Sequence, residues 1–341
     1  MTMTSKEIVR RTIHHQDHPR IAWDFATVSD LKHVGTVRLI NKEAEPFYKW
    51  GYYPELQKKA NFMNGEVCMD VYGNILGRLN GITKGECVLG ALESGLEDID
   101  KYSFPQIDLA FTEKVKAENN FKDCDKYVLS GLPFGVFSTL RDLRLMVNAL
   151  MDIAADPELV ENYLEKFAQF AVKLVDLAGD CGVDGVMIAD DWGMQDSPFI
   201  SPNSFAKLFK PVYKKITDAC HNRGMDFLLH SCGYVLPLVP HELEAGIDVF
   251  QFDQPEAAGS EMWARDFGDK AAFYSPVDIQ KILPTGDREL IETTAYNMVT
   301  NFKKYGGSLI AKDYPDYPSV GVKPEWATWA RDVILKNSDM K

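Results

Sequence analysis

The amino-acid sequence predicts an α/β fold, a single (β/α)8 TIM barrel that carries an N-terminal helical and β-hairpin insertion. From about residue 127 onward, short apolar runs alternate with amphipathic helical stretches, which is typical of parallel strands joined by right-handed crossovers. Runs such as GVMIA at 185–189 are apolar almost throughout, as expected of strands covered on both faces. The sequence has no G-x-G-x-x-G turn or Walker sequence, which disfavours the alternative, a doubly wound sheet. We therefore expect residues 1–341 to form one domain.

The N-terminal part is expected to begin the barrel and then to depart from it. Residues 4–15 are predicted to form a helix that Thr4 or Ser5 caps and that ends before Pro19. The apolar run 21–26, which contains Asp24, is a predicted buried strand. Between residues 45 and 110 the composition shifts to aromatic residues, glycine and short alternating runs, which indicates one or two helices and then a β-hairpin around 77–85. We interpret 45–110 as an insertion that caps the barrel mouth.

The rest of the chain supplies the repeating units of the barrel. Six further strands are predicted, at 127–131, 183–189, 226–230, 249–252, 271–274 and 308–311. Helices are predicted between most of them, at 139–153, 157–179, 202–222, 235–245 and 288–304. Together with 21–26 these make seven strands, and the eighth is expected in the least regular part of the chain.

Composition excludes several classes of protein. The 341 residues are 45% hydrophobic and 26% charged, as in an average globular protein, which excludes fibrous and disordered chains. With 50 acidic against 37 basic residues the net charge is -13, and no basic run is long enough to follow a phosphate backbone, so nucleic acid is not an expected partner. No stretch approaches the roughly 18 apolar residues of a membrane span, and the N-terminus is polar. We expect a cytoplasmic monomer or homodimer whose six scattered cysteines are reduced.

The residues that follow each strand at its carboxyl end form the active-site mouth of such a barrel. Five predicted strands run directly into polar residues there, which predicts a polar mouth: Asp190 and Asp191, His230 to Cys232, Asp253 and Gln254, Ser275 and Asp278, and Lys312 to Tyr314. We expect the catalytic residues among Asp190, Asp191 and Asp253, and the substrate contacts among Trp192, Tyr314 and Asp24.

His230 and Cys232 are the most specific candidate metal ligands in this group. Two residues apart in an extended segment they project to the same side, and an imidazole and a thiolate are typical zinc ligands. The alternative is a packed cysteine beside a hydrogen-bonded histidine, and the pair by itself favours neither. A catalytic zinc site generally uses three protein ligands. Asp313, at another strand end, is the first choice for the third ligand, and Asp253, Asp190 and Asp191 follow it.

Several segments resemble the uroporphyrinogen decarboxylase superfamily. The segment VMIADDWGMQDSPFISPNSFAKLFKPVYKKI is similar to its strand, acidic turn, "ISP" helix start and "KP" pair. LLHSCG followed by IDVFQFDQP resembles the branch made of cobalamin-dependent methyltransferases, and DVYGNILGRLNG followed by LEDIDKYSFP looks like an insertion common in that branch. The resemblance covers the chain from about residue 60 and implies a (β/α)8 barrel whose site lies at the C-terminal mouth.

The resemblance also implies which of two reactions to expect, decarboxylation or methyl transfer. True uroporphyrinogen decarboxylases resemble one another in an arginine-containing motif after the first strand, whereas here that place reads IAWDFATVSD. The methyltransferase branch typically binds zinc through a His-x-Cys pair, here His230 and Cys232, and a later cysteine. Alignment by eye places Asp313 at that cysteine position, which makes the expected site harder and more Lewis acidic.

The combined interpretation is a zinc-dependent methyltransferase of a corrinoid O-demethylase system. It would move a methyl group from a small methoxylated, aromatic compound to the cobalt of a corrinoid carried by a partner protein, since the chain has no D-x-H-x-x-G sequence of its own. The alternatives are methyl transfer from methylcobamide to a thiol, a metal-independent decarboxylase, and a non-catalytic accessory barrel.

Overall fold

The computed structural model describes residues 3–79 and 85–340, and its centre is a curled, mostly parallel sheet. Among the described residues, eight strands parallel to their neighbours follow one another in the spatial order β1-β14-β13-β12-β11-β10-β9-β3. These strands are β1 (Ala22–Phe25), β3 (Leu31–Val34), β9 (Tyr127–Gly131), β10 (Gly185–Ala189), β11 (Asp226–His230), β12 (Val249–Gln251), β13 (Ala272–Ser275) and β14 (Leu309–Lys312). The predicted (β/α)8 barrel is confirmed.

The sheet closes through a short connection that the sequence pattern does not reveal. After β1 the chain turns into β2 (Val28–Ser29), which pairs antiparallel with β1, and continues directly into β3. Asp30 joins the β1 side of the sheet to its β9 side. Its N–H donates to the carbonyl of Trp23 in β1, and its own carbonyl accepts from Tyr127 N of β9. The eighth strand is therefore β3, which follows β1 without a helix between them.

The helices around the barrel fall largely where the periodicity predicts them. They are α1 (Ser5–Ile13), α4 (Val136–Arg144), α5 (Met146–Ala155), α6 (Pro157–Asp180), α7 (Pro202–Ser204), α8 (Lys210–His221), α9 (Val239–Glu244), α10 (Ser260–Phe267), α11 (Arg288–Lys304) and α12 (Pro324–Asn337). The single helix expected at 139–153 is two helices, because Leu145 between them has a left-handed φ of 61°. The helix expected at 202–222 contains a π-helical stretch at Phe205–Phe209. Among the described residues, no helix is long and apolar enough to cross a membrane.

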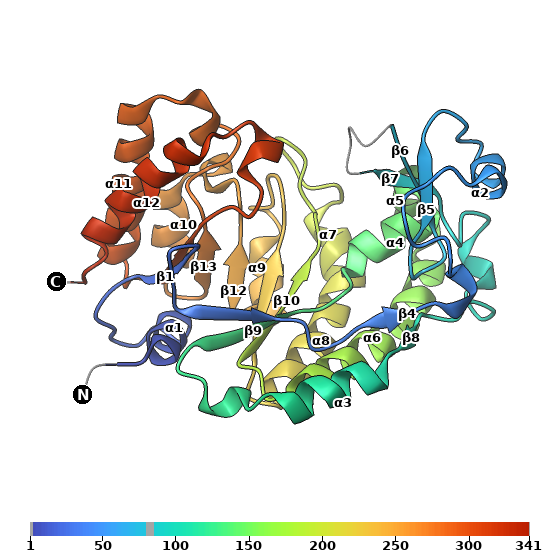
Figure 1. Ribbon diagram of the computed structural model, residues 1–341, viewed down its shortest axis with the longest axis horizontal. Coiled ribbons are helices and arrows are strands. Elements are labelled where there is room, and N and C mark those ends of the chain that lie inside the picture. Colours follow the sequence, from blue (N-terminus) through green and yellow to red (C-terminus); the bar gives the residue numbers. More distant parts are fainter. Residues whose placement is uncertain (1–2, 80–84, 341) are drawn as a thin grey trace.

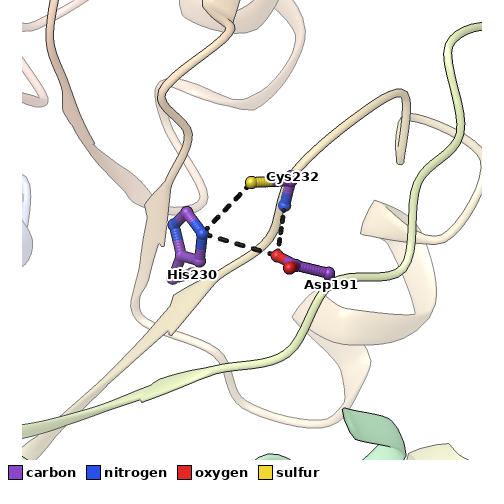
Figure 2. A group of neighbouring side chains, drawn as sticks. All are labelled: Asp191, His230 and Cys232. Atoms are coloured by element: carbon purple, nitrogen blue, oxygen red, sulfur yellow. Dashed lines mark hydrogen bonds and ion pairs between the residues drawn. The ribbon is translucent and has the colours of Figure 1, made fainter. Parts of the chain in front are cut away.

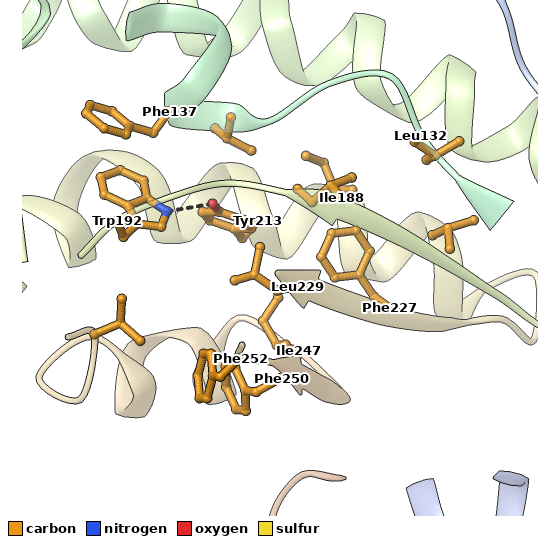
Figure 3. Close-up of a cluster of buried hydrophobic side chains, with 14 of the residues drawn as sticks. Leu132, Phe137, Ile188, Trp192, Tyr213, Phe227, Leu229, Ile247, Phe250 and Phe252 are labelled. Carbon is orange, nitrogen blue, oxygen red and sulfur yellow. Dashed lines mark hydrogen bonds between the residues drawn. The ribbon is translucent and has the colours of Figure 1, made fainter. Parts of the chain in front are cut away.

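Two layers of apolar side chains lie on either side of the barrel strands. The interior layer includes Leu129, Met187 and Leu228, and Ile8 and Val9 of α1 pack into it. The outer layer holds the strands against the surrounding helices, and Figure 3 shows part of it around Phe137, Trp192 and Phe250. Because strand side chains alternate, membership of the interior layer identifies which residues of each strand face the barrel axis.

Residues 35–126 form the insertion between β3 and β9. It contains α2 (Pro54–Lys59), α3 (Leu109–Glu118), the two-stranded sheet of β4 (Leu39–Ile40) and β8 (Gln106–Ile107), and the antiparallel sheet of β5 (Glu66–Met69), β6 (Ile75–Arg78) and β7 (Glu86–Leu89). The strands β6 and β7 form the hairpin predicted around 77–85, whose residues 80–84 lie outside the described part of the chain.

The insertion lies beside α4 and α5, at one side of the barrel (Figure 1). Arg144, at the end of α4, is nearly buried and donates to the carbonyl oxygens of Leu92 and Glu93 while it pairs with Asp152. The hydroxyl of Tyr72 donates to the carbonyl of Pro133 at 2.8 Å, in the loop that follows β9. The insertion therefore contacts the carboxyl edge of the barrel at this loop.

Candidate metal centre at the barrel mouth

His230, Cys232 and Asp191 come together at the carboxyl ends of β10 and β11 (Figure 2). The Nε2 atom of His230 lies 3.4 Å from Sγ of Cys232 and 3.5 Å from Oδ1 of Asp191. One nitrogen, one sulfur and one carboxylate oxygen thus lie within 4.8 Å of one another, and all three residues are partly buried. Imidazole, thiolate and carboxylate are the donor types found in catalytic zinc sites.

The backbone brings these residues together through a close crossing of the two loops. Ala189 pairs with His230 in the register of β10 and β11, which places the following residues of each strand side by side. The N–H of Gly193 donates to the carbonyl of Cys232 at 3.0 Å, and a Cβ atom at Gly193 would lie 2.5 Å from that carbonyl oxygen. Glycine at 193 therefore allows the two loops to approach each other closely. This approach lets the N–H of Cys232 donate to Asp191 Oδ1 at 3.0 Å.

A buried hydrogen-bond chain holds His230 from its other side. The Nδ1 atom of His230 contacts Oε1 of Gln251, whose Nε2 donates to Asp253 Oδ1 at 2.8 Å. Lys312 Nζ donates to the same oxygen at 3.0 Å. Because a carboxylate paired with a lysine accepts and does not donate, the Gln251 amide must present its NH2 to Asp253 and its oxygen to His230. The proton of the neutral imidazole then lies on Nδ1, which leaves the Nε2 lone pair for a ligand.

The electrostatics of the group favour a positive charge at its centre. Burial by itself lowers the pKa of His230, but Asp191 and Cys232 outweigh burial and raise that pKa to about 10. Burial opposes ionisation of Asp191, yet the hydrogen bond with His230 lowers the pKa of this carboxyl. Both shifts favour a positive charge between these side chains, which either a proton or a bound metal ion would supply.

Asp313 lies elsewhere in the mouth. Its Oδ2 accepts from the N–H of Ala26 at 2.9 Å and its Oδ1 accepts from Tyr317 at 3.2 Å, so it ties the ends of β1 and β14 together. In the described part of the chain, the metal-ligand group contains Asp191 and not Asp313. The geometry therefore favours Asp191 over Asp313 as a candidate third ligand, because β10 and β11 are adjacent in the sheet and β14 is not next to β11.

Asp190 and Trp192, on either side of Asp191, belong to the hydrophobic core. Asp190 is fully buried and accepts from the N–H groups of Phe137 and Ser138 at the start of α4, as well as from the hydroxyl of Tyr213. Trp192 is also fully buried, donates to Tyr213 at 2.8 Å and stacks on Phe137 (Figure 3). Asp190 thus caps α4 and Trp192 packs in the core, and neither side chain reaches the mouth, which contradicts the expectations that Asp190 is catalytic and that Trp192 contacts the substrate.

Asp24 forms a second polar cluster on the far side of the mouth. Its carboxylate accepts from Ser29 at 2.7 Å, from the hydroxyl of Tyr274, and from Nε2 of His33 at 2.8 Å. Burial opposes ionisation of Asp24, but His33, Tyr274 and Ser29 together lower its pKa to about 2. Tyr314 is partly exposed near its neighbour Tyr317, with ring centroids 6.1 Å apart.

Sequence reasoning missed Gln251, Tyr274 and His33. Each of these side chains faces the barrel axis, because each residue lies two positions after an apolar interior residue of its strand. Gln251 follows Val249, Tyr274 follows Ala272 and His33 follows Leu31. A polar residue at such a position is the signal that would find them, since interior positions are otherwise apolar.

Comparisons with known proteins agree with this fold. Residues 121–311, more than half of the chain, match the family "Uroporphyrinogen decarboxylase (URO-D)", and the chain belongs to that family. A solved structure described as "methyltransferase from Methanosarcina mazei" superposes with a TM-score of 0.65 at 14% sequence identity, over 98% of this chain and 99% of that one. A family 98 glycoside hydrolase catalytic module from Streptococcus pneumoniae TIGR4 is more distant, with a TM-score of 0.32 at 13% identity over 67% of this chain and 41% of that chain. No protein of curated function matches the chain in sequence.

Proposed function

We propose that this protein is a corrinoid-dependent methyltransferase that binds zinc through His230, Cys232 and Asp191. The observation that carries the proposal is the convergence of their nitrogen, sulfur and oxygen atoms within 4.8 Å at the barrel mouth. The end-to-end likeness of the fold to that of a methyltransferase supports it, as does the absence of an arginine from residues 21–30.

The donor set fits zinc better than it fits magnesium or calcium. Mg²⁺ and Ca²⁺ prefer oxygen ligands, whereas a sulfur, an imidazole nitrogen and a carboxylate are an accepted set for zinc with a fourth position open to substrate. In the neutral His230 ring the lone pair lies on Nε2, and together with the negative charge of Asp191 it agrees with this choice. When bound, zinc supplies a Lewis acid that favours negative charge on an ether oxygen.

The reaction we propose is the transfer of a methyl group from a small methoxylated, aromatic compound. The bond between the methyl carbon and the ether oxygen breaks, the electron pair stays on oxygen, and the methyl group forms a bond to the cobalt(I) of a corrinoid that a partner protein carries. The oxygen later takes up a proton and leaves as a hydroxyl. Asp253 and Gln251 hold the His230 ring, and Asp24 and Tyr314 contact the substrate. The insertion at 45–110, which touches the β9 loop, caps one side of this mouth.

The test combines metal analysis with turnover. Purified protein is expected to contain about one zinc ion per chain and to methylate added cob(I)alamin when supplied with a panel of methoxylated aromatic compounds, followed by the change in corrinoid absorbance. His230→Ala and Cys232→Ala should lose both zinc and activity. Zinc-free protein that decarboxylates a substrate would instead favour the metal-independent decarboxylase, and unchanged demethylation by both variants would overturn the proposal.

A further inference from the structure

One sector of the barrel mouth is open, above β9 and β10. Gly131 at the end of β9 is exposed, and a Cβ atom added there would have no neighbour within 4 Å. Ala189 at the end of β10 is also exposed. Both face the barrel axis, because Leu129 and Met187, two residues earlier in each strand, belong to the interior layer. Gly35, directly after β3, is likewise exposed with nothing within 4 Å of an added Cβ.

Large polar side chains fill the rest of the ring at this level. Going round the sheet from β11 to β1, His230 contacts Gln251, Gln251 contacts Asp253, and Asp253 pairs with Lys312. The ring continues through Tyr274, which donates to Asp24, and ends with His33 of β3. Gly35, Gly131 and Ala189 therefore leave an open space in the ring. The proposed zinc ligands lie at its β11 side and His33 lies at its β3 side.

His33 is suited to meet a ligand in this space. Its side chain is 50% exposed, and Asp24 orients the ring by accepting from Nε2–H at 2.8 Å. With the proton held on Nε2 by a carboxylate, Nδ1 of the neutral ring is a hydrogen-bond acceptor. Asp24 is itself fixed by Ser29 and Tyr274, so the ring is held by a rigid support.

We propose that the methyl donor lies in the open sector over Gly131 and Ala189, and that His33 accepts a hydrogen bond from a hydroxyl group at the end of the donor remote from the zinc ligands. The substrate class is then a methoxylated phenol. This inference rests on the proposed function and adds to it the position of the donor and the group that selects it.

The experiment uses the full-length, zinc-loaded protein with cob(I)alamin and three donors: methoxybenzene, a methoxyphenol and a methoxybenzoate. The wild type is expected to prefer the methoxyphenol. His33→Ala should lower kcat/KM for the methoxyphenol roughly tenfold, the worth of one good hydrogen bond, and leave methoxybenzene unchanged. An equal loss on all three donors, no loss, or a preference for the methoxybenzoate would overturn the assignment of His33.

The open sector is tested by filling it. Gly131→Val should lower turnover of all three donors roughly tenfold or more while zinc content and thermal stability stay at wild-type values, since a Cβ atom added at this position has no neighbour within 4 Å. Ala154→Val, which places a valine at an exposed position of α5, serves as the control and should behave like the wild type. Full activity of Gly131→Val would overturn the proposed position of the donor.

Failure of the proposed function gives a different result. If the wild type binds zinc but methylates cob(I)alamin from none of the donors, calorimetric titration with the methoxyphenol tests the site directly. Binding that Gly131→Val and His33→Ala abolish supports the position of the ligand and contradicts methyl transfer. Absence of binding to the wild type overturns the inference as well.

Discussion

Gln251 shows how a single side chain sets the chemistry of a neighbour. It lies between the buried pair of Asp253 and Lys312 and the ring of His230, and its amide orientation fixes which imidazole nitrogen is free. Partners of this kind orient metal-ligating histidines and raise their basicity. The metal affinity of the site should therefore depend on a residue that does not touch the metal.

Gln251→Leu keeps the volume of this side chain and removes the acceptor. We expect zinc affinity to fall about 10–100-fold, because His230 then loses its preferred tautomer and orientation. Competition with a chromophoric chelator measures the change. Gln280→Leu, at the exposed contact with Gln195, is the matched control, and equal zinc affinities for the two variants would contradict the role of Gln251.

Glu242 is a buried acid without a partner in the described structure. Both carboxyl oxygens lack a hydrogen bond, and burial, together with Asp190, raises the pKa of Glu242 from 4.5 to about 8. Between these two values the unfolded chain has lost the proton and the folded chain keeps it. The free energy of unfolding therefore decreases as pH rises through this window, by at most about 1.4 kcal/mol per pH unit.

Glu242→Gln cannot ionise and should remove this dependence. Relative to the wild type, its free energy of unfolding is expected to increase between pH 5 and pH 8, by on the order of 4 kcal/mol at most. Urea denaturation at several pH values measures the difference. A constant difference between the two proteins over this range would show that Glu242 is ionised in the folded state.

At the scale of elements, the end of β10 serves two purposes in two consecutive residues. Asp190 points into the core and caps α4, whereas Asp191 points to the mouth beside His230. The alternation of side chains at a strand end produces this division. One strand end thus fixes a helix and presents a metal ligand.

Alanine substitutions should separate the two roles. Asp190→Ala leaves the N–H groups of Phe137 and Ser138 and the Tyr213 hydroxyl without their acceptor, which should lower the free energy of unfolding by about 2–4 kcal/mol. Asp191→Ala should change stability by less than about 1 kcal/mol and weaken zinc binding strongly. Denaturation curves and metal titrations of both variants check this, and a reversed pattern would refute the assignment.

At the scale of the whole molecule, the metal site joins two neighbouring units of the barrel. Ligands from the ends of both β10 and β11 would tie these units together in the folded state, and the unfolded chain would not hold them in place. Binding to the folded state alone must raise stability in proportion to the logarithm of the zinc concentration.

Zinc at 100 times its dissociation constant should stabilise the fold by about 2.7 kcal/mol and raise Tm by a few degrees. Differential scanning calorimetry of chelator-treated protein, with and without added zinc, measures the shift. Cys232→Ala should abolish it. A shift of the same size in this variant would mean that zinc binds elsewhere.

Much of this protein is determined locally and can be predicted from its sequence. The strands 127–131 and 226–230 and the helix 288–304 coincide with β9, β11 and α11, because apolar periodicity and caps are local properties of the chain. The pair His230 and Cys232 is local too, since two residues in an extended segment share one side of it. These features established the barrel and the first two candidate ligands.

Tertiary structure decided the rest, because it depends on which strand ends are neighbours and which side chains turn inward. Asp191 and not Asp313 joins His230, since β10 is adjacent to β11 and β14 is not. Asp190 and Trp192 are core residues, since α4 and α8 cover that face of β10. His33 enters the mouth because Asp30 closes the barrel between β1 and β9. These contacts join residues that are far apart in the sequence, so local patterns carry no signal for them, and they arise only when the sheet closes.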